Sequence, residues 1–191
     1  MPRPIPEDAI DYVERLHAAV DEVAAPVASA NAERLRCRRG CAGCCTDDLT
    51  VFTIEAALIV RHHGELLDQG APHPAGGCAF LDETGGCRVY AHRPYVCRTQ
   101  GLPLRWLEED EEDGAIVESR DVCPENAAGP PLETLEAEAC WTLGPFEERL
   151  AARQDSVEPG ARVALRDLWG RGRSIGGRAS PRPPIRRLPL L

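Results

Sequence analysis

The chain has 191 residues and a formal net charge of −9, and this length suits one domain with its own core. It contains three Phe, three Trp and three Tyr, so the core must be mostly aliphatic. The acidic balance argues against a protein that binds nucleic acid through its whole surface. No stretch approaches the roughly 20 consecutive apolar residues of a membrane span, so we expect no membrane partner.

The N-terminus, MPRPIPED, is polar and rich in proline, and it lacks the apolar run of a secretory signal. We therefore expect a cytoplasmic protein whose thiols are reduced. Structural disulfides are rare in that compartment, and an odd number of cysteines fits a disulfide framework poorly. Metal binding is thus favoured over disulfide pairing for the nine cysteines of the chain.

The first predicted element is an amphipathic helix from about Asp8, because apolar residues recur there at intervals of three and four. These residues are Ile10, Val13, Leu16, Val20 and Val23. Pro26 is expected to break or kink this helix, and a second helical piece can follow over residues 27–35.

A further helix should start at Thr53 as its N-cap, with His62 and His63 in the last turn and Gly64 at the end. The buried stripe of this helix would comprise Ile54, Ala57, Leu58 and Ile59. Two histidines at a helix C-terminus need no function, because a cation is favourable there.

The segment Leu102–Leu107 alternates between apolar and polar residues, and it could pair with Ala115–Ser119 in a hairpin. The acidic run Glu108–Asp113 between them lacks the spacing of a calcium loop and is expected to be a solvated turn. Three more helices are predicted, over residues 132–143, 146–152 and 162–169. We expect the arginine- and proline-rich tail, residues 170–191, to be disordered.

These elements predict an α+β fold: a small helix-rich domain with an irregular, cysteine-rich, metal-organised centre and one short hairpin. It would consist of an N-terminal helical segment, a cysteine-cluster metal-binding region of the same domain, C-terminal helices and the tail. The corresponding ranges are 1–36, 37–124, 125–169 and 170–191.

Eight of the nine cysteines fall between residues 37 and 123, and four of these occupy only nine residues. The eight are Cys37, Cys41, Cys44, Cys45, Cys78, Cys87, Cys97 and Cys123. Thiolates repel one another and are costly to desolvate, so crowding them indicates a cation that absorbs the charge. Cys140 lies apart in a predicted helix, where a buried structural thiol explains it.

The spacing of the cysteines restricts how they can bind a metal. In an extended chain Cys44 and Cys45 point to opposite sides, so they serve different metals, or one is spare, or the site is polynuclear. In a regular hairpin Leu81 would face Cys87, whereas Cys78 would lie roughly 10 Å further along, on the other face. We therefore expect this segment to be an irregular loop.

Polar neighbours of the cysteines are further candidates. Four arginines adjoin them in the sequence and could lower thiol pKa values or donate hydrogen bonds to sulfur, or they could be ordinary surface residues. They are Arg36, Arg38, Arg88 and Arg98. His73 and His92 could replace a thiolate in a mixed site, although a non-ligand role is the simpler interpretation.

The segments CAFL at 78–81 and CRVYAHRPYVCR at 87–98 resemble the signature of the CxxCxxCC zinc- or iron-chelating proteins, also called YkgJ-like cysteine-cluster proteins. The resemblance covers about residues 37–123, and Cys123 is a weaker ligand candidate. The family pattern has two residues between its first cysteines, whereas three separate Cys37 from Cys41. As chelating residues the resemblance marks Cys41, Cys44, Cys45, Cys78, Cys87 and Cys97.

The metal itself can be argued in two directions. Cys37, Cys41 and Cys44, closed by a distant cysteine, would suit a [4Fe–4S] cluster. Zinc ribbons usually pair two C-x2-C knuckles, and here only Cys41 and Cys44 form one. We therefore favour an iron–sulfur cluster over zinc, although eight thiols could also make two four-thiolate zinc sites.

The expected function is metal binding by the cysteine cluster, with the metal ion or cluster as partner and any protein partner unknown. Two alternatives remain. Similar domains in flagellin lysine N-methylases imply a redox or methyltransfer enzyme or enzyme subunit. The six arginines of residues 171–191 suggest a zinc-stabilised interaction module that binds nucleic acid or an acidic protein.

Overall fold

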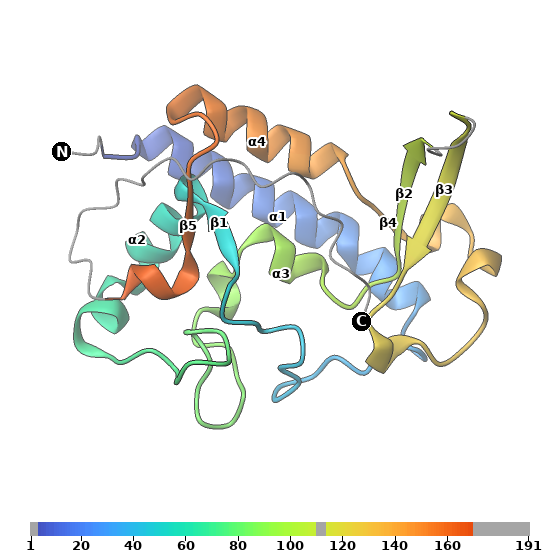
Figure 1. The fold of residues 1–191 in the computed structure, drawn as a ribbon, viewed down its shortest axis with the longest axis horizontal. Coiled ribbons are helices and arrows are strands. Elements are labelled where there is room, and N and C mark those ends of the chain that lie inside the picture. Colours follow the sequence, from blue (N-terminus) through green and yellow to red (C-terminus); the bar gives the residue numbers. More distant parts are fainter. Residues whose placement is uncertain (1–3, 110–113, 170–191) are drawn as a thin grey trace.

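The structure is a computed structural model that describes residues 4–109 and 114–169. Its elements confirm the predicted α+β class, with helices and two small sheets around irregular loops. Figure 1 shows the long helix α1 (Glu7–Ala30) running through the molecule with α4 (Pro145–Val157) beside it. The predicted disordered tail and most of the acidic turn lie outside the described residues.

Helix α1 buries one face along its whole length, as the apolar spacing predicted. The prediction that Pro26 ends or kinks the helix into two pieces was wrong, because one helix continues through Pro26 to Ala30. Pro26 is exposed, while Val27 beside it is buried and holds the last turn against the core. Val23 was also assigned to the wrong face: it is 49% exposed, and Ala24 takes its place in the core.

Helix α2 (Thr53–Gln69) buries the predicted apolar stripe but differs at both ends. Thr53 is the first helical residue rather than the N-cap, and its buried hydroxyl donates to Gln154 of α4. Gly64 does not end the helix. Instead His63 adopts non-helical backbone angles that kink it, and the helix continues to Gln69 because Leu67 reaches the core.

The predicted hairpin is confirmed as β2 (Leu104–Glu109) paired antiparallel with β3 (Ile116–Asp121). The predicted helix over residues 132–143 was wrong. That segment forms two 3-10 turns (Leu132–Thr134 and Ala137–Ala139) and then β4 (Trp141–Thr142), parallel to β2. The buried Trp141 donates its backbone N–H to the Pro103 carbonyl, so contacts with β2 override the local helical pattern.

The C-terminal region contains one confirmed helix and one corrected segment. Helix α4 covers the predicted residues 146–152 and extends beyond them. Residues 162–169 are not a helix: they form β5 (Arg162–Ala164), followed by a 3-10 turn (Leu165–Leu168). β5 pairs antiparallel with β1 (Thr50–Phe52), a partner more than 100 residues away in sequence that no local pattern reveals.

Two groups of buried apolar side chains form the core. One lines α1 and includes Ile54, Tyr95, Trp141 and Leu150. The other lies between α2, β1 and β5 and includes Phe80 and Val89 from the central loops, with Cys78 and Cys87 packed against it. The irregular cysteine segments are therefore anchored to the core. None of the helices in the described ranges combines the length and the apolar character needed to cross a bilayer.

Candidate metal centre

The candidate ligands come mainly from loops on one side of α1 and α3 (Tyr95–Thr99), as Figure 1 shows. Residues 37–49 and 70–89 contain no helix or strand apart from one isolated bridge between Leu81 and Cys87. The Leu81 N–H donates to the Cys78 carbonyl, so the chain turns before that bridge instead of extending from it. The predicted irregular loop is confirmed, and Cys78 is not carried away from Cys87 by a regular strand.

Two tight turns arrange the cysteine run. The Cys41 N–H donates to the Arg38 carbonyl at 2.9 Å, in a turn that needs the positive φ of Gly40. The Cys45 N–H donates to Ala42 at 2.9 Å, so Cys44 lies within a turn. The adjacent thiols are thus not held on opposite sides of an extended strand.

Cys44 and Cys45 interact directly through their sulfur atoms. Their side-chain hydrogen bond lowers the pKa of Cys44 to about 6 and raises that of Cys45, which burial raises further. Between these two pKa values the pair therefore holds one proton, whereas two separate thiols with ordinary pKa values would hold one proton each. Chain segments also meet here, because the Cys78 N–H donates to the Cys45 carbonyl at 2.8 Å.

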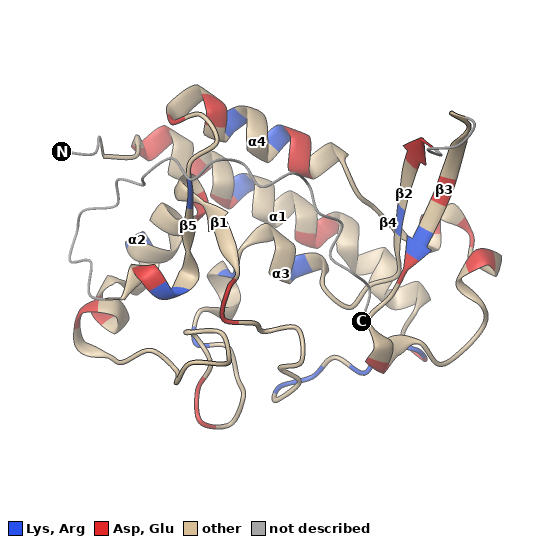
Figure 2. Ribbon diagram, in the orientation of Figure 1, with Lys and Arg blue, Asp and Glu red and all other residues tan. Residues whose placement is uncertain are grey.

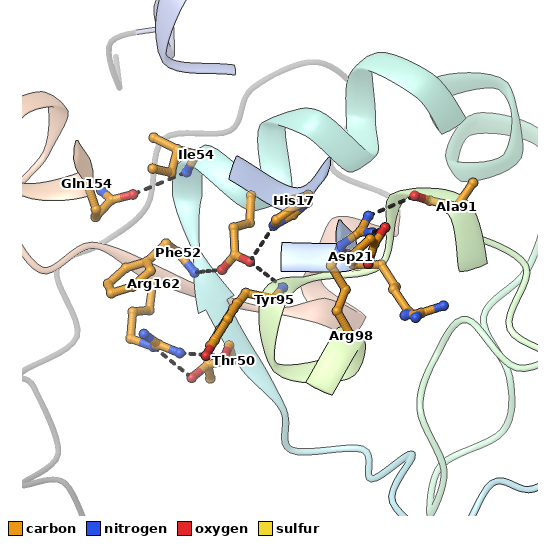
Figure 3. Close-up of polar contacts among 12 residues, drawn as sticks. His17, Asp21, Thr50, Phe52, Ile54, Ala91, Tyr95, Arg98, Gln154 and Arg162 are labelled. Atoms are coloured by element: carbon orange, nitrogen blue, oxygen red, sulfur yellow. Dashed lines mark hydrogen bonds and ion pairs between the residues drawn. The ribbon is translucent and has the colours of Figure 1, made fainter. Parts of the chain in front are cut away.

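Cys97, like Cys45, is hard to ionise without a cation. Burial, and then the charges of Cys78 and Cys87, raise its pKa to about 12. Its helix α3 begins where the backbone N–H of Tyr95 donates to the buried carboxylate of Glu55, 2.8 Å away. The same carboxylate contacts His17, so α1, α2 and α3 meet at this one group (Figure 3).

Asn126, which is completely buried, connects the loop that carries Cys37 with the loop that carries Cys123. Its side-chain carbonyl accepts from the Arg36 N–H at 2.7 Å, and its amide donates to Gly101 O at 2.7 Å and to Cys37 Sγ at 3.4 Å. Gly101 has a φ of +94°, and a Cβ there would lie 2.5 Å from Cys37 Sγ. A side chain at this position would displace the thiol.

The mutual charge effects divide the thiols into two neighbouring groups. In the first, inner group, burial and neighbouring thiols together raise the pKa of three members. The pKa of the fourth, Cys78, is raised mainly by burial. The inner group comprises Cys45, Cys78, Cys87 and Cys97. In the outer group, burial and then the other three thiols raise the pKa of Cys123. The outer group comprises Cys37, Cys41, Cys44 and Cys123. Cys44 also forms a side-chain hydrogen bond with Cys45 of the inner group.

Cys140 does not join these groups. Burial raises its pKa, and the charged groups that act on it are Arg120, Glu118, Arg105 and Arg34 rather than other thiols. It is 4% exposed, as expected of a structural thiol. The expected helix around it was wrong, because its backbone is extended just before β4.

The arginines beside the cysteines have different roles. Arg98 pairs with Asp21 and donates to two carbonyls, including that of Ala91, so it joins α3 to α1 (Figure 3). Arg88 donates to the Ala79 carbonyl and lies over the Trp169 ring, and its charge lowers the pKa of Cys78 and Cys87 against the effect of burial.

Arg36 and Arg38 lie in the basic segment that precedes the cysteine run, visible as a blue loop in Figure 2. Together with Arg39, Cys41 and Glu125 they line a hollow of about 390 Å³. Three arginines and one glutamate thus surround this hollow, next to an outer-group thiol.

Of the two histidines considered for a mixed site, His92 lies with other histidines, whereas His73 lies beside the Cys78 loop through a bond from its N–H to the Ala79 carbonyl. His92 stacks on His62, with ring centroids 3.9 Å apart, and contacts His63. His73 precedes Cys78 in the loop over residues 70–89, and its backbone carbonyl accepts a hydrogen bond from Arg166. Asn126 and Glu55 were missed by the sequence analysis. The position of Asn126 three residues after Cys123 was the one available signal, whereas nothing local distinguishes Glu55.

The donor set fits a soft or borderline cation, because the thiols lie in two adjoining groups and the ionisation of five of them is opposed until positive charge is supplied. No curated protein and no solved structure matches the chain. Residues 36–124 match the family model CxxCxxCC, described as a putative zinc- or iron-chelating domain. Over residues 36–124 the chain is therefore similar to the CxxCxxCC family.

Proposed function

We propose that the protein binds iron through its cysteine cluster, in the form of an iron–sulfur cluster. The observation that carries this proposal is the spread of the thiols. Four thiolates around one zinc ion lie about 3.8 Å apart. Within the described residues, no three cysteine sulfurs all lie within 4.8 Å of one another. A polynuclear cluster is reached by thiolates that lie farther apart.

The inner group is the best candidate for the principal ligands. Its members come from three separate segments and are partly shielded from water, and Cys78 and Cys87 pack against the core. Reduction potential and stability of such clusters depend on burial and on hydrogen bonds to sulfur. In the outer group, Cys37 and Cys44 are exposed. We propose that the outer thiols complete the cluster or bind a second metal.

Residues that are not ligands would fix the positions of those that are. Glu55 holds the start of α3 and so the position of Cys97, and Asn126 donates to Cys37 Sγ. The charge of Arg88 favours the thiolate forms of Cys78 and Cys87. A bound cluster would supply electron transfer, and these residues would orient and shield its ligands.

Metal analysis of protein purified without oxygen tests the proposal. We expect iron and acid-labile sulfide in matching amounts, with a broad absorption band near about 400 nm. Stoichiometric zinc without colour would overturn the iron–sulfur assignment and leave a structural zinc protein.

Two serine substitutions test the assignment of ligands. Cys97→Ser should lose most of the bound metal, because it removes an inner thiol. Cys140→Ser is the matched control: it also replaces a buried thiol, but one outside both groups, and should keep its metal. Equal metal contents in both variants would contradict the inner-group assignment.

The arginine-lined hollow beside Cys41 favours a second candidate, an enzyme that binds a small molecule through its carboxylate or another anionic group next to the cluster. Redox or methyl-transfer chemistry with S-adenosylmethionine is one such activity, since that compound carries a carboxylate. We would add it to the reduced protein and record the EPR spectrum. An altered cluster signal would support the enzyme, and an unchanged one would count against it.

A further inference from the structure

Three of the five histidines in the chain lie together, outside both thiol groups. His62 and His63 lie at the kink in α2, and His92 ends the 3-10 turn Tyr90–His92. Glu14 reaches them from α1. Segments far apart in sequence thus bring three imidazoles and a carboxylate to one place.

The donor atoms of Glu14, His62 and His92 all lie within 4.8 Å of one another, the one such group of three in the described ranges. His62 Nε2 is 3.2 Å from Glu14 Oε1. Two imidazoles and one carboxylate form a donor set that binds divalent transition metals with an open coordination position. We propose that Glu14, His62 and His92 form a second metal site, for a divalent ion of the Zn²⁺ type.

Neighbouring side chains already orient two of the three donors. His63 Nε2 lies 3.0 Å from His92 Nδ1, and a proton on Nδ1 would leave Nε2 of His92 as the lone pair for a cation. Arg61 donates to Glu14 Oε2 at 2.6 Å, which leaves Oε1 toward His62. Such partners of the ligands hold rings and carboxylates in binding orientation.

The site is open to ions from solution. The side chains of His62 and Glu14 are 32% and 48% exposed. The rings of His62 and His92 are stacked with planes 9° apart, whereas two ligands of one ion must point their nitrogens at a common centre. Metal binding therefore requires the His62 ring to turn about χ2 while His63 holds the His92 ring, a rotation that the exposure of His62 allows.

Nearby charges do not remove the attraction for a cation. Arg98 acts on His92 but is paired with Asp21, and Arg61 is paired with Glu7 and Asp11 in addition to the proposed ligand Glu14. The donors here are nitrogen and oxygen, unlike the sulfur donors of the thiol groups. The two kinds of site can thus be distinguished by spectroscopy, and this inference does not depend on the proposed iron–sulfur cluster.

Titration of the full-length protein with Co²⁺, with its native metal left in place, tests the inference. Co²⁺ bound by nitrogen and oxygen gives weak visible bands, without the intense near-ultraviolet band of a thiolate complex. We expect one Co²⁺ to bind with this spectrum. Zn²⁺ should shift the imidazole ¹⁵N resonances of His62 and His92 and leave those of His73 in place.

Three glutamine substitutions complete the test. His62→Gln and His92→Gln should each weaken Co²⁺ binding by more than about tenfold, because each removes a direct ligand. His73→Gln is the control and should bind Co²⁺ as the wild type does. Folding of each variant is checked by circular dichroism, and the exposed His62 keeps the test valid if His92→Gln misfolds. Unchanged Co²⁺ affinity in folded His62→Gln, or no such ion bound by the wild type, would overturn the inference.

Discussion

Single buried polar side chains order the cysteine loops. Asn126 satisfies the Arg36 N–H and the Gly101 carbonyl and also reaches Cys37 Sγ. Its 0% exposure means that water cannot replace these bonds. One amide thus connects the start of the cysteine run, the end of α3 and the Cys123 loop.

Asn126→Ala should lower the free energy of unfolding by about 2–4 kcal/mol, because it leaves buried backbone groups unpaired. It should also reduce metal retention, since Cys37 loses its donor. Urea unfolding and metal analysis after dialysis measure the two effects.

The control is Asn31→Ala. Asn31 is also buried and donates to the carbonyls of Val27 and Ala139. Within the described residues these side-chain bonds go to carbonyls and not to a thiol, so its loss should destabilise the fold and leave metal retention unchanged. Equal loss of metal in both variants would mean that Asn126 acts only through general stability.

Asp82 gives a prediction about pH. Hydrogen bonds from the Thr84 hydroxyl and the Gly86 N–H lower its pKa from 3.8 to about 2. A lowered pKa in the folded state adds stability that is present above about pH 4 and lost as the pH falls toward 2. The Asp82 carboxyl resonance should titrate near pH 2. In Asp82→Asn the unfolding free energy should fall less steeply over this range than in the wild type, and an equally steep fall would contradict the prediction.

Among the elements, those with a repeating apolar face were predictable and those held by distant partners were not. The faces of α1 and α2 follow from side-chain spacing. β5 exists because β1 pairs with it, and β4 because β2 does. Short strands of two or three residues carry too little pattern to be distinguished from a helical turn.

Pro26 is a locally unfavourable residue inside α1, and tertiary packing compensates for it. It lacks the N–H that would bond within α1, yet the buried Ala24 and Val27 keep the helix intact. Pro26→Ala should raise the free energy of unfolding by about 1–3 kcal/mol, since it restores that bond at an exposed position. Thermal unfolding measures the change. An unchanged or lower midpoint would show that the packing of α1 depends on the proline.

On the scale of the whole molecule, we expect the cysteine loops to depend on metal more than the helices do. The first core group lines α1 without any cysteine, whereas Cys78 and Cys87 pack against the second. Few regular backbone hydrogen bonds hold residues 37–49 and 70–89. Metal would therefore organise one side of the fold rather than all of it.

Removal of the metal with a chelator should lower the thermal midpoint and loosen these loops, while most of the helical circular dichroism remains. Limited tryptic digestion with mass mapping measures the loosening. Cleavage after Arg38, Arg39 and Arg88 should become faster, and cleavage after Arg149 in α4 should change little. Uniform acceleration at all four sites would mean that the metal supports the entire fold.

The sequence by itself determined the eight candidate thiols, the faces of the long helices and the hairpin, because spacing along the chain carries this information. Only the tertiary structure decided which thiols adjoin, since turns at Gly40 and Ala42–Cys45 reverse the chain in ways that parity rules do not foresee. It alone also brought His62 and His92 to Glu14 and buried Asn126 beside Cys37. Such contacts depend on how separate elements pack, and no single segment encodes them.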